Sequence, residues 1–209
     1  MNRAIVVKLT AAVVIAIFAV SSWVTSGEFD LTWLRFFSAA VLIVTLLLTA
    51  YDLWLWRIPL VQKLPGVPRN VRGTWKGEIA SMWVDAAAGR QVGPIDAFLV
   101  VRQTSSMVSV RLFTHESSSS STLARVAEPD GSPVLDYLYL NRPRTRVRDR
   151  SPMHHGSVAL EVSGRPAHRL AGRYWTDRSS KGEMRFETRR SKVVDDFDDA
   201  VALFSGRRS

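Results

Sequence analysis

The chain has 209 residues, a formal net charge of +9 and no cysteine. The lack of cysteine excludes disulfide bonds, thiolate metal sites and cysteine nucleophiles. The length allows one or two domains, and the part that follows the first sixty or so residues has the size of a single domain. The basic charge suits an anionic partner, such as a lipid headgroup, a nucleic acid or a phosphorylated small ligand.

Residues 1–63 predict a transmembrane hairpin. Apolar stretches at residues 4–24 and 33–56 each reach the roughly 20 residues needed to cross about 30 Å of hydrocarbon. The outer flanks of both stretches are basic and the short turn between them is acidic, so the positive-inside rule places both termini in the cytoplasm. A cleaved signal peptide, with residues 1–20 as its basic and apolar regions, is the competing interpretation.

Two charged residues, Lys8 and Asp52, lie near the cytoplasmic ends of the predicted spans. If the hairpin turns near Glu28, Lys8 and Asp52 come within about one helical turn of each other. An ion pair between the helices is one interpretation of these charges. Separate snorkelling of each side chain to the interface is the other.

Residues 64–72 contain Pro and Gly and predict a linker, and residues 73–190 predict an all-β domain. Eight segments alternate apolar and polar residues with a period of two and end in turn residues. They cover residues 73–82, 95–103, 107–115, 118–127, 134–141, 154–162, 168–177 and 182–189. Strands without intervening helices favour an antiparallel up-and-down meander, and eight strands suffice to close a compact β-barrel.

The rim of this barrel predicts a ligand site. In a meander the odd-numbered strands end where the even-numbered strands begin, and this rim collects polar residues of small or medium size. A polar mouth above a packed opposite end predicts a ligand cup. The interior and rim residues expected to line the cup are Thr114, Tyr137, Tyr139, Asn141, His154, Tyr174 and Thr176.

Arginines dominate the connection between the fifth and sixth predicted strands, at the same mouth. They are Arg142, Arg144, Arg146, Arg148 and Arg150, and Arg178 follows the seventh strand. Arginine forks match phosphate oxygens and tyrosines on the barrel wall could stack on bases, so the pattern predicts a nucleotide site. A solvated loop, or a patch attracted to anionic lipid, explains these arginines equally well.

The tail at residues 191–209 is acidic, and its apolar residues recur at helical spacing, as in a segment that packs on the barrel or on a neighbour. The four histidines lack metal-ligand spacing, and the sequence contains no Gly-x-Ser-x-Gly, Walker or His-Glu-x-x-His motif. The sequence therefore predicts no enzyme, no metal and no cofactor.

The order of several motifs resembles a known family. The two predicted spans are followed by Gly73-Thr74-Trp75-Lys76-Gly77, Leu135-Asp136-Tyr137-Leu138-Tyr139, His154-His155-Gly156 and Leu170-Ala171-Gly172-Arg173-Tyr174-Trp175-Thr176-Asp177-Arg178 with Gly182. This layout resembles the two-transmembrane, β-strand-rich effectors of bacterial CBASS anti-phage operons.

The resemblance implies a multi-pass protein of the bacterial inner membrane that is not an enzyme. Its barrel would bind a cyclic di- or oligonucleotide made by a partner nucleotidyltransferase (a CD-NTase), and no DNA or RNA partner is expected. Binding would drive homo-oligomerisation in the lipid bilayer, disruption of the membrane and death of the infected cell. The alternative function is a membrane-tethered, lipocalin-like carrier of a lipid or other apolar ligand, which the Gly73-x-Trp75 start also fits.

Overall fold

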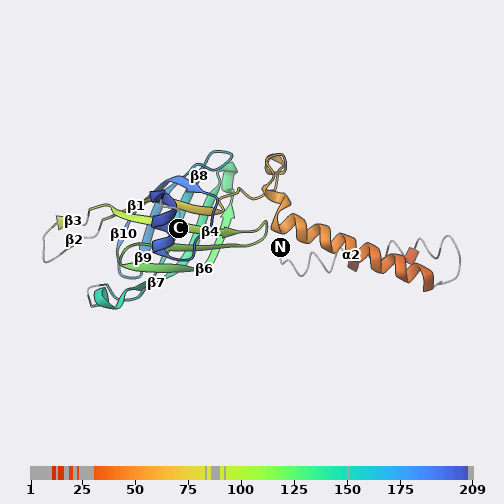
Figure 1. Cartoon of the computed structure of the whole chain (residues 1–209), viewed down its shortest axis with the longest axis horizontal. Coiled ribbons are helices and arrows are strands. Elements are labelled where there is room, and N and C mark those ends of the chain that lie inside the picture. The colour runs from red at the N-terminus through yellow and green to blue at the C-terminus, as the bar shows by residue number, and fades with distance from the viewer. Residues whose placement is uncertain are drawn as a thin grey trace. The chain divides into compact units, whose positions relative to one another are not determined.

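The computed structural model describes residues 31–82, 84–85, 90–91, 93–149 and 151–206, and also residues 11, 12, 14–16, 19, 20 and 23 (Figure 1). The chain divides into two compact units, Met1–Trp56 and Arg57–Ser209. The predictions made for Lys8, for the turn near Glu28 and for most of the first span concern residues outside this set.

The first unit contains helix α2, Leu31–Leu53, of 23 residues, which overlaps the second predicted span. Thr45 and Thr49 each donate a hydroxyl hydrogen bond of 2.8 Å to the carbonyl one turn earlier. Asp52 lies in the last turn and is buried, whereas large apolar side chains are exposed at Leu42, Ile43, Leu46, Leu47 and Leu48. Within the described residues, no helix is both long enough and apolar enough to pass through a bilayer.

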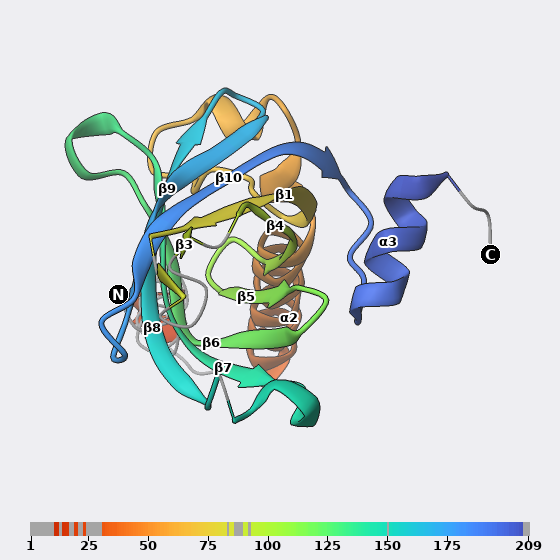
Figure 2. The same ribbon diagram turned by 90° about the vertical axis from the view of Figure 1, so that its left-hand side faces the viewer.

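The second unit contains a closed barrel of eight antiparallel strands, seen from one end in Figure 2. The strands are β1 (Gly73–Ser81), β4 (Ile95–Gln103), β5 (Val108–Phe113), β6 (Ser117–Ala127), β7 (Val134–Pro143), β8 (His154–Ser163), β9 (Arg169–Thr176) and β10 (Lys181–Arg190). They pair in the order β1-β10-β9-β8-β7-β6-β5-β4, which confirms the predicted barrel. A two-stranded ladder of β2 (Val84–Asp85) and β3 (Arg90–Gln91) between β1 and β4 was not predicted, because two-residue strands leave no period.

Apolar side chains fill the interior of the barrel. Trp75, Leu99, Leu135, Leu160, Leu170 and Phe186 are fully buried, and burial of such a side chain contributes about 1.5–3 kcal/mol. The residues that alternation assigns to the interior of β4, Leu99, Val101 and Gln103, are all buried. At the β-bulge in β1, a Cβ on Gly77 would overlap the Arg185 carbonyl and the Phe186 ring, so only glycine fits there.

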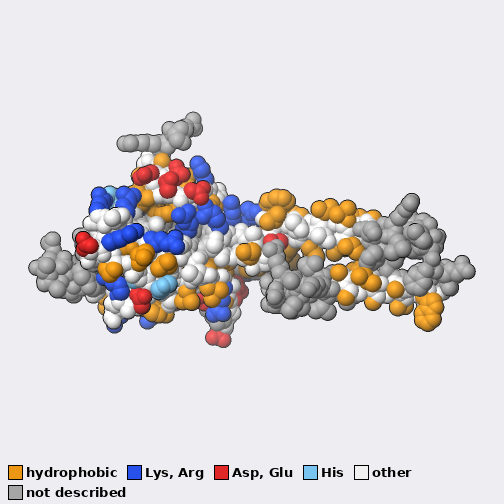
Figure 3. Space-filling model, turned by 90° about the horizontal axis from the view of Figure 1, so that it is seen from below, with side chains coloured by type: hydrophobic (Ala, Val, Ile, Leu, Met, Phe, Trp, Pro, Cys, Tyr) orange, Lys and Arg blue, Asp and Glu red, His pale blue; other side chains and the backbone are white. Residues whose placement is uncertain are grey.

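The outward residues of the barrel are largely charged. Figure 3 shows one face of the molecule, on which Lys and Arg side chains gather over the barrel. Cross-strand neighbours on the outer face often carry opposite charges, as in the pairs Glu78 with Arg185 and Arg173 with Glu183. This pattern of charged outward positions and apolar inward positions explains why the strands were readable in the sequence.

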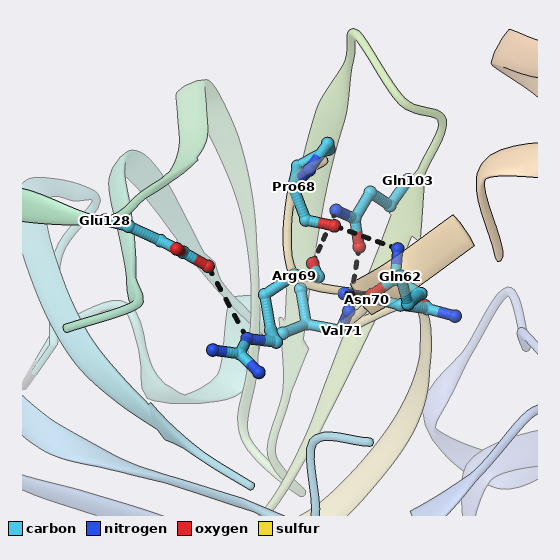
Figure 4. Close-up of polar contacts among 7 residues, drawn as sticks. All are labelled: Gln62, Pro68, Arg69, Asn70, Val71, Gln103 and Glu128. Atoms are coloured by element: carbon cyan, nitrogen blue, oxygen red, sulfur yellow. Dashed lines mark hydrogen bonds and ion pairs between the residues drawn. The ribbon is translucent and has the colours of Figure 1, made fainter. Parts of the chain in front are cut away.

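The end of the barrel opposite the mouth, here called the tethered end, is closed by residues 64–72. Gln103 at the end of β4 accepts from the Val71 amide and donates to the Arg69 carbonyl, both at 2.9 Å. Gln62 similarly accepts from the Asn70 amide and donates to the Pro68 carbonyl, both at 3.1 Å (Figure 4). The segment predicted as a linker is therefore bonded to the barrel.

The tail contains helix α3, Phe197–Ser205, which packs on the outside of the barrel. Asp196 caps the helix by accepting from the Asp199 amide at 2.8 Å, and Gly206 ends it in the left-handed conformation. The rings of Phe197 and Phe204 each lie 5.7 Å from the ring of Phe98 on β4. The helix thus covers apolar residues that face outward from the sheet.

Candidate functional site

Four connections lie at the predicted mouth of the barrel, and three of them carry candidate site residues or contact those that do: residues 114–116, 144–153 and 177–180. The fourth joins β1 to β4 and contains β2 and β3. The Arg144 amide donates to the Glu116 carbonyl at 2.8 Å, and the Arg146 guanidinium donates to Nδ1 of His115 at 3.3 Å. On the other side, the Arg178 guanidinium donates to the Ser151 hydroxyl at 3.3 Å. The connection between β7 and β8 is therefore bonded to both of its neighbours.

A short 3-10 helix, η4 (Thr145–Val147), sets the direction of the arginines in this connection. Val147 is buried and anchors the loop, so Arg144, Arg146 and Arg148 on either side of it are exposed. Arg148 also donates from Nε to the Pro143 carbonyl at 3.4 Å. None of these three guanidinium groups pairs with a carboxylate in the part of the chain that the structure describes.

Arg142 does not belong to this cluster. It lies within β7 and is exposed, whereas its neighbours Asn141 and Pro143 are buried, so its side chain belongs to the outer face of the barrel. Arg150 lies outside the described residues. The cationic cluster of the mouth, called the rim arginines below, consists of Arg144, Arg146, Arg148 and Arg178.

The predicted site residues of the barrel interior are buried beneath the rim. Tyr137, Tyr139 and Tyr174 are each at most 8% exposed, and Asn141 is buried as well. The Tyr139 ring lies 6.0 Å from the Tyr137 ring and occupies space that a Cβ at position 156 would need, which only Gly156 leaves free. The expected open cup is therefore filled by these side chains.

Burial raises the pKa of Tyr137 and Tyr139, and for Tyr139 the nearby Tyr174 and Asp177 add to the effect. Both phenols therefore remain protonated at neutral pH. The Tyr137 hydroxyl is buried and has no hydrogen-bond partner within the described residues. A buried hydroxyl without a partner costs about 1–3 kcal/mol, so this group gains from any acceptor that reaches it.

The two rim threonines are engaged in turns. Thr114 Oγ1 accepts from the Ser117 amide at 3.1 Å, and Thr176 Oγ1 lies 2.7 Å from the Ser180 hydroxyl. These contacts stabilise the turns that carry the mouth. His154 is half-buried, and its Nδ1 lies 3.0 Å from the Pro152 carbonyl, which can only accept, so Nδ1 donates to it.

A groove on the side of the barrel was not predicted from the sequence. A groove of about 430 Å³ opens on the outer face of β1, β8, β9 and β10. Small residues form its floor and both signs of charge line it: Ala80, Ala171, Glu78, Glu161, Arg173, Glu183 and Arg185. Alanines at outward positions between long charged residues were the available signal. Within the described residues, no three His, Asp or Glu side chains converge on a metal site.

Comparisons with known proteins identify the family of the barrel domain. Residues 66–188 match the family described as Cap15, cyclic dinucleotide receptor domain. A similar protein is the CD-NTase-associated protein 15 of Staphylococcus schleiferi, which is 21% identical over 181 residues, covering 87% of this chain and 94% of the relative. The matched residues begin seven residues before β1 and end within β10, so the match covers the barrel except for the last two residues of β10. The chain therefore belongs to the family of Cap15 cyclic dinucleotide receptor domains.

Proposed function

We propose that this protein is an anti-phage effector of a CBASS system whose barrel binds a cyclic di- or oligonucleotide made by a CD-NTase. The observation that carries the proposal is the family match, because it coincides with the barrel and stops short of both the N-terminal segment and helix α3. The name of the staphylococcal relative, which associates it with a CD-NTase, supports the same source of ligand.

The rim arginines are the proposed phosphate site. Each phosphodiester of a cyclic nucleotide presents two oxygens that a guanidinium fork can hold with two hydrogen bonds. The rim arginines come from two connections that the contact between Arg178 and Ser151 holds together, so they can meet both phosphates of one ligand. The interior tyrosines are too deeply buried to stack on a base unless the rim opens, so the ligand is expected to lie on the rim near His154.

The N-terminal segment is the proposed output of the effector. In this proposal the stretches at residues 4–24 and 33–56 cross the bacterial inner membrane, with both termini in the cytoplasm, and assemble when the barrel is occupied. The apolar sequence of both stretches and the exposed leucines of α2 support this role. A ligand shifts the equilibrium between monomer and oligomer only if it binds the two states with different affinity. The mouth of the barrel must therefore differ between the monomer and the oligomer. The assembled hairpins would then disrupt the membrane and kill the infected cell.

The proposal is tested by titrating the full chain in detergent with a panel of cyclic di- and trinucleotides. A rise in the unfolding temperature with at least one of them is expected, because a ligand that binds only the folded state stabilises it. No shift with any cyclic nucleotide, at concentrations that saturate a known receptor, would exclude the sensor function.

The alternative of an apolar ligand carrier is less well supported. A carrier needs interior space for its ligand, whereas Trp75, Leu99, Leu160 and Phe186 fill the middle of this barrel. Extraction of the purified protein with organic solvent, followed by mass spectrometry, tests it. Stoichiometric lipid together with indifference to nucleotides would favour the carrier.

A further inference from the structure

Exposed apolar side chains lie in the segment that enters the barrel at its tethered end. Leu60 is 74% exposed, Leu64 55% and Ile58 44%. They surround the 3-10 helix η2, Val61–Lys63, which belongs to the same compact unit as the barrel. Large apolar side chains so close together on a surface mark a site of interaction.

This segment is held in place by a buried amide. Gln62, in the middle of η2, is 8% exposed and is bonded to the backbone of both Pro68 and Asn70 (Figure 4). Because the Gln62 side chain turns inward, its neighbours on the segment turn outward. The structure therefore presents Leu60 and Leu64 in a fixed position relative to the barrel.

Exposed cations lie at the same end of the barrel. Five exposed cations come from the entering segment, the connection between β8 and β9, and the end of β10: Lys63, Arg165, Arg169, Arg190 and Lys192. Within the described residues none of the five forms an ion pair, whereas the nearby Arg69 pairs with Glu128 at 3.5 Å. These charges are free to bind an external anion.

Arg189 holds the three cationic segments together. Its guanidinium donates to the carbonyls of Asn70, Arg72 and Ala167 at 2.7–3.1 Å. Asn70 and Arg72 follow the entering segment, Ala167 lies between Arg165 and Arg169, and Arg190 is the next residue. The segments that carry the cations are thus held together at the end of the barrel where the leucine-bearing segment enters it.

Exposed apolar side chains next to unpaired cations are the combination that binds the headgroup layer of an anionic membrane. The apolar residues enter the boundary between headgroups and acyl chains, and the cations meet lipid phosphates. The chain also arrives at this surface from the unit that contains α2, the apolar helix of the proposed membrane segment. A lipid surface is therefore the partner that both the chemistry and the chain order favour.

We propose that the tethered end of the barrel, with Ile58, Leu60 and Leu64 at its centre and Lys63, Arg165, Arg169, Arg190 and Lys192 around them, docks on anionic phospholipid. The inference rests on the proposed membrane location but not on nucleotide binding, since the mouth lies at the opposite end. In this proposal each basic end of the barrel binds a different anion: the mouth binds the nucleotide, and the tethered end binds lipid phosphate.

The absence of cysteine from the chain allows a direct test. A spin label is attached to Leu60→Cys, or to Thr145→Cys at the mouth as the control, in the full chain reconstituted into nanodiscs. The rates at which the label collides with oxygen, which is enriched in lipid, and with a nickel complex, which stays in water, then report whether the label is immersed in the lipid. In discs that contain phosphatidylglycerol we expect the label at position 60 to be immersed and the label at position 145 to remain in water. Equal access of the nickel complex to both labels would overturn the proposal.

Charge reversal tests the role of the cations. Arg165→Glu with Arg169→Glu should abolish immersion of the label at position 60, and Arg173→Glu with Arg185→Glu, on the side of the barrel, should preserve it. Equal immersion in both double variants would show that the tethered end does not bind lipid phosphate. Nucleotide binding, measured on the same samples, should be unchanged by Arg165→Glu with Arg169→Glu. Immersion without any nucleotide response would contradict the proposed sensor function and leave lipid docking intact.

Discussion

The guanidinium carbon of Arg189 lies 5.2 Å from the centre of the indole ring of Trp75. Trp75 is fully buried and donates its indole hydrogen to the Val71 carbonyl at 2.9 Å. The same guanidinium reaches the backbone on both sides of the tethered end, at Asn70 and at Ala167. Burial and the nearby Arg72 lower the pKa of Arg189, which stays charged at neutral pH because arginine starts from so high a value. Arg189 therefore joins the core of the barrel to the segment that closes it.

Replacing Arg189 with lysine should destabilise the barrel by about 2–4 kcal/mol. Lysine keeps the charge but cannot form the planar fork that bridges three carbonyls and stacks on Trp75. Urea unfolding of the full chain in detergent measures the loss. Arg190→Lys, one residue along and exposed, is the matched control and should change the free energy of unfolding by less than about 0.5 kcal/mol.

Replacing Arg144, Arg146 and Arg148 with serine should weaken nucleotide binding and reduce its dependence on salt. The reason is that each guanidinium lost removes a charge-assisted contact to phosphate, worth about 1.5–3 kcal/mol. Calorimetric titration at two salt concentrations measures both effects, and circular dichroism should show an unchanged barrel.

The matched control for the triple serine variant removes three other exposed arginines, Arg125, Arg173 and Arg185, from the sides of the barrel. Nucleotide affinity should survive this change. Weakened binding in the control, with full binding in the rim variant, would move the phosphate site to the outer groove that Arg173 and Arg185 line.

Gly156→Ala should destabilise the mouth by about 1–3 kcal/mol, because the added methyl group would overlap the ring of Tyr139. The measurement is the unfolding temperature, with the near-ultraviolet spectrum of tyrosine as a local probe. Gly93→Ala is the control, since its Cβ would meet nothing within 4 Å. Similar unfolding temperatures for both variants would mean that the Tyr139 ring is not fixed against β8.

The stability of the barrel should fall as the pH rises above about 10. Burial raises the pKa of Tyr137 and Tyr139 in the folded chain, so these phenols stay neutral there while the unfolded chain loses their protons. The stability that their protonation contributes is complete below the pKa of the unfolded chain and is lost as the pH rises towards the folded values.

The double variant Tyr137→Phe with Tyr139→Phe tests this dependence. Urea unfolding at neutral pH and above pH 10 should show a smaller alkaline loss of stability than in the unaltered protein. At neutral pH, Tyr137→Phe alone should not destabilise the barrel, because its hydroxyl forms no hydrogen bond within the described residues. An unchanged alkaline loss in the double variant would show that other groups cause it.

The strands could be predicted because inward and outward residues of the barrel differ in polarity. Tyr137, Tyr139 and Asn141 alternate with outward residues on β7, and the structure buries all three. On β4, residues 97–101 are apolar on both faces, which indicated that another segment covers the outward side chains of Phe98 and Val100. Alternation within the strand could not show which segment this is, and in the structure it is α3.

The contacts that close and shape the ends could not be predicted from periodicity. Gln62 and Gln103 bond to the backbone of residues 68–71, Gln62 from six to eight residues away in the sequence and Gln103 from 32 to 34. Neither the local bonds nor the long-range ones leave a repeating pattern in the sequence. The rim threonines were expected to face a ligand, yet Thr114 and Thr176 bond within their own turns. From the sequence alone, a polar residue at the rim is equally consistent with a role in a turn and a role in ligand binding. Only the hydrogen bonds in the structure distinguish the two roles.

Each strand of the barrel is paired on both sides, since β1 bonds to both β10 and β4. A barrel closed in this way offers no strand edge to which another chain could add a β-strand. Copies that keep the barrel closed can therefore meet through side chains, through their N-terminal segments or at the β2–β3 ladder outside the barrel. The proposed assembly would leave the hydrogen bonds of the barrel intact, so a nucleotide would start and stop it without the cost of unfolding a barrel strand.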